Sequence, residues 1–355
     1  MKDIIIVGGG LTGMLAARSL HDAGVNVMLI DQNELGSESS WAGNGVISPL
    51  YPWRSSAETL ELTYKTQQQY ADLCAELQDE TRINPELMTS GLLSLDADEC
   101  TAAAPWLANH RHEAVATDHL DGSILNGNQA IKDCEPSLQC DHEQAVFLPN
   151  IRQVRNPHLV QAVAASLRHR PLMISEHQPV TKIKTKKNRA VGVKLKGKTF
   201  KADKVILAAG VNSDAFAELK PVTDGQSLSK ENIILFRGEP GVLNHIVVKN
   251  GSYLIPRKDG RILCGTSRAV EHKDTQPDGA VYDELREFAC GLIPALEDVP
   301  IRHHWAGLYA RNAQHASSVG AHAEIRGLYV NTGHGEEGMA TGLASVQKLV
   351  AEVLK

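Results

Sequence analysis

The sequence lacks the features that mark several classes of protein. No apolar run in its 355 residues approaches the roughly 18 residues that span a bilayer. The apolar stretch after Lys2 is only four residues long and leads into a glycine loop, so we expect a structural strand there and no signal peptide. The formal net charge of −6 disfavours a nucleic acid or an anionic membrane as the main partner.

Cysteine and histidine motifs are missing as well. The six cysteines include no C-x-x-C pair, so neither a zinc site nor a redox dithiol is indicated. The fifteen histidines are scattered, and the two close sets, His110 with His112 and His303 with His304, have no carboxylate or cysteine companions at ligand spacing, so we expect no metal. Without a secretion signal, we expect reduced thiols and a cytoplasmic protein.

The chain opens with the parts of a dinucleotide-binding unit. Residues 4–7 form a β-branched run typical of a buried parallel strand, and the loop at residues 8–13 has the spacing G-x-G-x-x-G. In such a loop Gly8 permits the tight turn, Gly10 lets the backbone approach a pyrophosphate, and Gly13 lets a helix pack closely on the strand.

A helix, a second strand and an acid follow that loop in register. Gly24 ends the helix, residues 25–30 form the second strand, and Asp31 stands where a carboxylate can bind the hydroxyl pair of a ribose. Together these parts predict a bound dinucleotide more strongly than the glycine spacing does alone.

The far end of the chain carries a second glycine-rich junction. We expect a strand at residues 328–331, then the segment TGHGEEG at 332–338, then a helix that continues to Lys355. Helix N-termini present unpaired N–H groups and a positive dipole end, which suit partial negative charge on a ligand. Residues 204–210 form a buried strand whose small final residues also let a cofactor approach closely.

These segments together resemble the D-amino-acid oxidase family of flavoproteins, over nearly the whole chain. The resemblance is carried by the opening loop, SSWAGNGVISPLYPWR at residues 39–54, QVRNP at 153–157, AAG at 208–210, YLIPRKDGRILCGT at 253–266, WAGL at 305–308 and GLYVNTGHGEEG at 327–338. The segment at 39–54 is most similar to the glycine oxidase subgroup of thiazole biosynthesis.

The resemblance implies FAD, and noncovalent FAD because no cysteine stands where related enzymes attach the flavin. It implies a flavin ring beside residues 43–46, adenine at Val180, and a positive helix end at the last junction that stabilises the reduced flavin. The residues then expected to bind FAD are Gly8, Gly10, Leu11, Thr12, Gly13, Asp31, Gln32, Ser40, Gly43, Asn44, Gly45, Val46, Val180, Ala209, Gly210, Gly333, His334, Gly335, Glu336, Glu337, Gly338 and Met339.

The implied reaction moves hydride from the carbon that bears an amine to flavin N5, and the imine then hydrolyses. Positioning and electrostatics carry the catalysis if the amine is bound neutral. The expected partners are a small amine or amino-acid substrate and oxygen or another electron acceptor, and a homo-oligomer is left open. The residues expected at the substrate are Tyr253, Tyr309, Arg268, Arg311 and Glu336.

Two positions depart from the family pattern. Family members hold the substrate carboxylate with an arginine directly after WAGL, where this chain has Tyr309, and glycine oxidases have a second arginine where it has Glu336. A tyrosine hydroxyl cannot replace the charge of a bidentate arginine. Three interpretations stay open. In the first, Arg268 or Arg311 binds the substrate carboxylate. In the second, the substrate is an amine that has no carboxylate and is attracted to Glu336 or Glu337. In the third, those glutamates only cap the helix.

The predicted architecture is mixed α/β, with a Rossmann-like FAD-binding domain interleaved with an antiparallel-sheet substrate domain. The FAD-binding domain takes residues 1–82, 147–215 and 305–355, and the substrate domain takes 83–146 and 216–304. Within the latter we expect residues 83–146 to be irregular, with short strands. The favoured function is an FAD-dependent amino-acid or amine oxidase or dehydrogenase. The alternatives are an FAD-dependent 2-hydroxy-acid dehydrogenase, a flavoprotein subunit without independent turnover, and a nicotinamide dehydrogenase.

Overall fold

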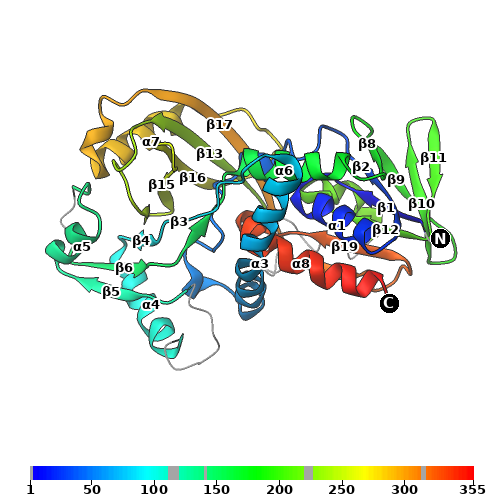
Figure 1. Ribbon diagram of the computed structural model, residues 1–355, viewed down its shortest axis with the longest axis horizontal. Helices are drawn as coiled ribbons and strands as arrows, with labels where there is room; N and C mark the ends of the chain where they lie inside the picture. Colours follow the sequence, from blue (N-terminus) through cyan, green and yellow to red (C-terminus); the bar gives the residue numbers. More distant parts are fainter. Residues whose placement is uncertain (1–2, 111–119, 140–141, 220–226, 313–316) are drawn as a thin grey trace.

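The computed structural model describes residues 3–110, 120–139, 142–219, 227–312 and 317–355. It has a mostly parallel sheet at one end of the long axis and a larger, mostly antiparallel sheet at the other (Figure 1). The predicted mixed α/β fold is confirmed.

The parallel end is a six-stranded sheet in the order β18-β19-β12-β1-β2-β8, in which only β18 runs antiparallel to its neighbour. Its strands are β1 (Asp3–Val7), β2 (Asn26–Ile30), β8 (Met173–Ser175), β12 (Lys204–Leu207), β18 (Ser318–Ala321) and β19 (Leu328–Thr332). The predicted strands at 4–7, 25–30 and 328–331 are confirmed, while the strand predicted at 204–210 ends at Leu207.

Both faces of this sheet are covered because its central strand is apolar on both faces. Alternation along β1 directs Ile4 and Ile6 into one core cluster and Ile5 and Val7 into another. The first cluster is formed with four helices, α1 (Leu11–Asp22), α3 (Ala57–Thr81), α6 (Asn156–Arg168) and α8 (Gly338–Val353). The second is formed with a three-stranded sheet, β9 (Val180–Thr185), β10 (Ala190–Leu195) and β11 (Lys198–Lys201).

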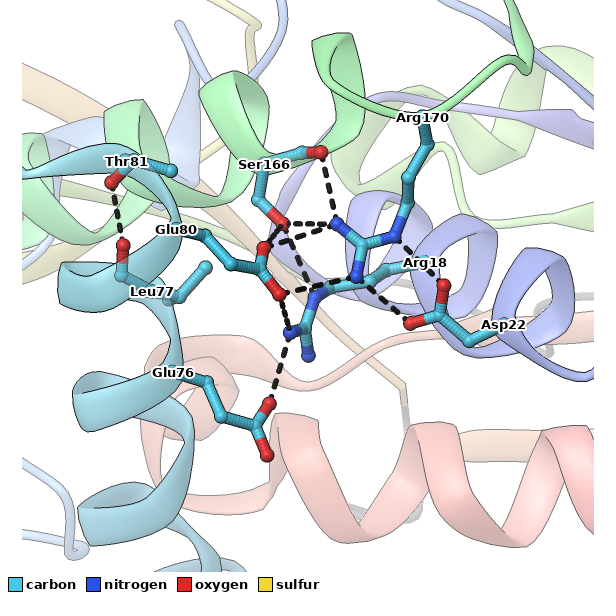
Figure 2. Close-up of polar contacts among 8 residues, drawn as sticks. All are labelled: Arg18, Asp22, Glu76, Leu77, Glu80, Thr81, Ser166 and Arg170. Atoms are coloured by element: carbon cyan, nitrogen blue, oxygen red, sulfur yellow. Dashed lines mark hydrogen bonds and ion pairs between the residues drawn. The ribbon is translucent and has the colours of Figure 1, made fainter.

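A network of charged side chains ties the helices together beside the first cluster (Figure 2). Arg18 of α1 pairs with Glu76 and Glu80 of α3 at 2.9 and 2.8 Å. Arg170, just after α6, pairs with Glu80 at 3.1 Å and with Asp22 of α1 at 2.8 Å. The hydrogen bond from Arg170 lowers the pKa of Glu80 to about 2 against the opposing effect of burial.

The other end is an eight-stranded sheet in the order β17-β13-β16-β15-β14-β4-β6-β5, in which β4 and β14 form the one parallel pair. Its strands are β4 (Leu92–Ser94), β5 (Ser123–Asn126), β6 (Gln144–Leu148), β13 (Ser227–Arg237), β14 (Ile246–Lys249), β15 (Ser252–Pro256), β16 (Arg261–Val270) and β17 (Ile301–Arg311). The remaining elements are α2 (Ser39–Ala42), α4 (Ala97–His110), α5 (Asn128–Cys134), α7 (Gly279–Leu292), β3 (Met88–Thr89), β7 (Arg152–Gln153) and the 3₁₀ turns η1 (Pro52–Arg54), η2 (Gly210–Leu219), η3 (Pro294–Leu296) and η4 (Gly335–Glu337).

Two sequence-based expectations differ from this fold. The expectation of an irregular segment at 83–146 is wrong, because α4 and α5 lie within it. The sequence of α4 has several alanines in place of large apolar residues and contains Pro105, so its apolar residues show no clear helical periodicity. The boundary predicted at residue 305 falls inside β17, which pairs with β13 along its length. Residues 305–311 therefore belong to the eight-stranded sheet, and the division into domains stays a prediction.

Among the described residues, no helix combines the length and apolar character needed to cross a membrane. Five of the six cysteines are free thiols, and Cys140 lies outside the described residues. Within the same part of the chain, no group of three or more potential ligands is arranged to hold a metal ion.

Candidate active site

The first glycine junction joins β1 to α1 and lines a large cavity. Gly8 has a φ of 109°, and a Cβ there would overlap a backbone carbonyl just after β12, so only glycine fits. A Cβ on Gly13 would overlap the Gly8 carbonyl, so the helix packs tightly on the turn. Gly10 is the N-cap residue of α1, and the next N–H, that of Leu11, donates to Ser40 Oγ at 2.9 Å.

Asp31 lines the same cavity at the end of β2. Its carboxylate accepts from the N–H of Gly9 at 2.5 Å and from the N–H of Asn33 at 2.7 Å. Burial raises the pKa of Asp31, and these bonds oppose the shift. The carboxylate therefore ties the glycine loop to the end of the second strand, and Gln32 and Val180 also line the cavity.

The second glycine junction, between β19 and α8, lines the cavity too. Gly333 and Gly335 have φ values of 79° and 57°, which favour glycine. Burial lowers the pKa of His334 to about 4, so its ring is neutral; the ring nitrogens lie 2.7 Å from Asn331 Oδ1 and 2.9 Å from Thr341 Oγ1. This ring fixes the turn that starts α8.

Both glutamates of this junction lie in its first helical turn, and Glu337 departs from the capping interpretation. Glu337 is the N-cap residue of α8, yet its side chain makes no capping hydrogen bond. It pairs with Arg311 instead, at 3.2 Å between Nη2 and Oε1. Burial raises the pKa of Glu337, and the charge of Arg311 opposes the shift. The neighbouring Glu336 lines the cavity.

The cavity has an empty volume of about 1360 Å³, counted with the space open to solvent. The predicted cofactor residues that line it are Gly8, Gly10, Leu11, Thr12, Asp31, Gln32, Ser40, Gly43, Asn44, Gly45, Val180, Ala209, Gly210, Gly333, His334, Gly335, Glu336, Gly338 and Met339. Three others, Gly13, Val46 and Glu337, do not line it.

The cavity wall suits FAD, a dinucleotide with an anionic pyrophosphate. No lysine or arginine is among the lining residues that the structure describes, so backbone must supply the positive potential. Two helix N-termini, those of α1 and α8, do so. A Cβ on Gly210 would meet nothing within 4 Å, so this glycine keeps part of the wall open.

The loop at 43–46 connects the cavity with a buried cation. Arg257 on the turn after β15 donates from Nη2 to the Asn44 carbonyl at 2.8 Å and from Nη1 to the Val154 carbonyl at 3.0 Å. Its Nη1 also contacts Gln153 Oε1. Burial among these neutral acceptors lowers the pKa of Arg257 to about 10.

A buried carboxyl group lies behind the wall that Asn44 and Tyr309 form. Glu231 on β13 is 2% exposed, and its Oε1 accepts from Tyr253 Oη at 2.6 Å and from Asn44 Nδ2 at 3.3 Å. Its Oε2 accepts from the hydroxyl of Tyr309, the one of these two tyrosines that lines the cavity. We call Glu231, Tyr253 and Tyr309 the carboxyl–tyrosine cluster.

Strand register assembles this cluster. Glu231 lies opposite Gly307 on β17, two residues from Tyr309, so alternation places both side chains on the same face. Tyr253 on β15 lies opposite Gly265, where a Cβ would overlap the phenol ring. Burial raises the pKa of Glu231 to about 7, while the bonds from the two tyrosines oppose the shift.

Sequence reasoning missed Glu231, although it found both tyrosines. The local sequence SLSKENIILFR gives no sign that this glutamate is buried, because polar residues surround it on one side. The only available signal is the register of β13 against β17, which depends on residues far apart in the chain.

The expectation that Arg268 reaches the cavity is wrong. Arg268 on β16 lies opposite Lys230, one residue from Glu231, so it points to the other face of the sheet. Its side chain is 53% exposed and pairs with Glu284. Arg311 is closer: it shares the face of Tyr309 and packs under Gly335, but it pairs with Glu337 and does not line the cavity.

Comparison with known proteins agrees with this geometry. A family model described as FAD dependent oxidoreductase matches residues 3–353. A glycine oxidase of Pseudomonas putida is 33% identical, over 98% of this chain and 93% of the relative. A glycine oxidase of Pseudomonas aeruginosa is 34% identical, over 99% of this chain and 94% of the relative.

A solved structure gives the same fold at lower identity. The crystal structure of a glycine oxidase from Geobacillus kaustophilus has a TM-score of 0.91 and 22% sequence identity, and the match covers 100% of this chain and 95% of that one.

Proposed function

The chain belongs to the FAD dependent oxidoreductase family, and we propose that it oxidises a small amine or amino acid at a carbon–nitrogen bond. The observation that carries this proposal is the meeting of two structures at one cavity: two glycine junctions that suit a dinucleotide, and a carboxyl–tyrosine cluster that suits an amine. The two Pseudomonas relatives, which are glycine oxidases, support the same reaction type.

We propose that the cofactor residues named above hold FAD, with Asp31 at a ribose and the N-termini of α1 and α8 at the partial negative charges. When bound, FAD supplies the hydride acceptor. The electron acceptor, oxygen or another compound, and a cytoplasmic location are part of the same proposal.

The carboxyl–tyrosine cluster orients the amine and takes its excess proton. An amine gives up hydride in its neutral form, so a bound ammonium group must first lose a proton. That proton moves to Tyr309 Oη while the hydroxyl proton of Tyr309 moves to Glu231 Oε2. A carboxyl with a pKa of about 7 suits this transfer, because it is partly ionised near neutral pH and yet accepts a proton readily.

Anaerobic mixing of the yellow protein with glycine, D- and L-amino acids, N-methyl amino acids, simple amines and 2-hydroxy acids tests the proposal. We expect loss of flavin absorbance with compounds that carry an amine on a C–H carbon and none with hydroxy acids. Reduction by hydroxy acids alone, or by no compound, would contradict it. Peroxide formation under air would identify oxygen as the acceptor.

A further inference from the structure

We propose that the end of the cavity beside Tyr309 binds a positively charged amine that has no carboxylate on the reacting carbon. The inference rests on the proposed function for the reaction itself, and it goes further by naming the charge class of the substrate. It follows from three features of this chain: the charges on the cavity wall, the direction of the Tyr309 hydroxyl, and the partner of Arg311.

The first feature is the balance of charge. The described wall includes the carboxyl groups of Asp31, Glu34, Glu38 and Glu336 but no lysine or arginine. Asp31 already accepts from two backbone N–H groups at the end of β2. Glu336, by contrast, lines the wall at the second junction, and its charge acts on buried Glu231, raising the pKa of that carboxyl beyond the effect of burial. A substrate carboxylate placed there would face the buried carboxyl of Glu231 and the exposed carboxyl of Glu336, and the repulsion from the buried group in particular costs free energy.

The second feature is the direction of the Tyr309 hydroxyl. Its proton is donated to Glu231 Oε2, so the oxygen offers only lone pairs to the cavity. Lone pairs accept from an ammonium N–H and repel a carboxylate oxygen. The ionised form of Glu231 fixes this orientation, because a carboxylate accepts and cannot donate.

The third feature is the partner of Arg311, which shares the face of β17 that carries Tyr309. Its guanidinium pairs with Glu337 and lies under Gly335, where a Cβ would come within 2.7 Å of Nε. Its side chain is 30% exposed. A substrate carboxylate would have to share this guanidinium with Glu337, whose side chain is only 20% exposed, and the two carboxylates would repel each other.

The experiment compares two ions that share a tert-butyl group and carry opposite charge, on the FAD-loaded protein. Tert-butylammonium is a cation without a hydrogen on the carbon that bears nitrogen, so it cannot be oxidised; pivalate is its carboxylate counterpart. Binding is followed by the change in the flavin absorption spectrum. We expect tert-butylammonium to bind at least tenfold more tightly than pivalate, and tighter binding of pivalate, or equal binding, would overturn the inference.

Variants locate the site of binding. Glu231→Gln and Tyr309→Phe should each weaken tert-butylammonium binding about tenfold, because one removes the charge and the other the acceptor oxygen. Tyr309→Phe keeps the ring and serves if Glu231→Gln fails to fold. Glu284→Gln, which removes a half-exposed carboxylate on the outer helix α7, should leave binding unchanged. Unchanged binding in both Glu231→Gln and Tyr309→Phe would contradict the inference.

The binding measurement and the reduction assay separate the two proposals. If tert-butylammonium binds preferentially while no amine or amino acid reduces the flavin, the inference stands and the proposed function fails. If glycine reduces the flavin and pivalate binds more tightly, the proposed function stands and the inference fails. In that case Arg311→Gln should abolish pivalate binding, because Arg311 would then hold the carboxylate.

Discussion

Backbone groups form most of one end of the cavity, whereas side chains form the other. The cofactor end is made of backbone: glycine turns, helix N-termini and an aspartate that accepts two N–H groups within one local unit. The substrate end is made of side chains, and three separate strands, β13, β15 and β17, each supply one member of the carboxyl–tyrosine cluster. The first end therefore depends mainly on backbone conformation, whereas the second depends on which side chains stand at three positions.

The largest expected effect tests the backbone construction of the cofactor end. Gly13→Val should destabilise the protein by about 3 kcal/mol and abolish FAD retention, because its Cβ would overlap the Gly8 carbonyl. Urea unfolding and the FAD released per chain measure both effects. Gly291→Val on α7 is the matched control, since a Cβ there meets nothing within 4 Å. Normal stability of Gly13→Val would show that the junction tolerates a side chain.

A smaller effect is expected where the cofactor end does use a side chain. Asp31→Ala removes the acceptor of the Gly9 and Asn33 N–H groups, and FAD should bind about 10- to 100-fold more weakly, a loss of about 1.5–3 kcal/mol. Titration of the apoprotein with FAD measures this. Glu34→Ala, an exposed carboxylate on the same wall, should bind FAD normally. Equal affinities of the two variants would remove Asp31 from the site.

A substitution at the proposed substrate end should change the pKa of Glu231 and leave FAD retention unchanged. Tyr253→Phe removes one donor to Glu231, so the pKa of this carboxyl should rise further above about 7, by roughly one unit. The ionised form of Glu231 accepts the amine proton, so the rate of anaerobic flavin reduction should rise with pH. In Tyr253→Phe the pH at which this rate is half-maximal should be higher than in the wild type. Tyr282→Phe on α7, which packs on His304, is the control. An unmoved midpoint would mean that Glu231 takes no part in proton transfer.

The smallest effect concerns the network of ion pairs around Glu80 that links α3 with α1 and the end of α6. The pKa of Glu80 is depressed to about 2 in the folded protein, so its contribution to stability is present above the unfolded value of about 4.5 and is lost as pH falls through that window. Glu80→Gln should therefore lose less stability than the wild type between pH 5 and pH 3, measured as the change in Tm. Glu76→Gln, a more exposed carboxylate on the same helix, should resemble the wild type. Flavin reduction at neutral pH should be the same in all three proteins.

The difference between the two ends also explains what the sequence could predict. The cofactor end depends on neighbours in the chain, so the spacing of Gly8, Gly10 and Gly13 and the position of Asp31 already describe it. The strands of the parallel sheet were predictable for the same reason, because residues 4–7 are apolar on both faces.

The substrate end depends on register between distant strands. Nothing near Glu231 in the sequence links it to Tyr253 or Tyr309, since those pairings arise only when β13 lies between β16 and β17. Arg268 was misplaced for this reason: it is one residue out of phase with the cluster, and one residue decides the face of a strand. Helix α4 escaped prediction because few of its residues, such as Cys100 and Leu107, are both apolar and buried.

The long pairing of β13 with β17 restricts how this protein can diverge. Removing or adding one residue between Trp305 and Tyr309 would reverse the faces of the strand beyond it, turning the tyrosine away from Glu231 and placing Leu308 or Ala310 at the position that Tyr309 now holds. If the proposed role of residues 231 and 309 holds, substitutions there can change the choice of substrate, whereas a change in the length of either strand would separate the two side chains. Insertions and deletions should be tolerated better in the surface connections outside these two strands.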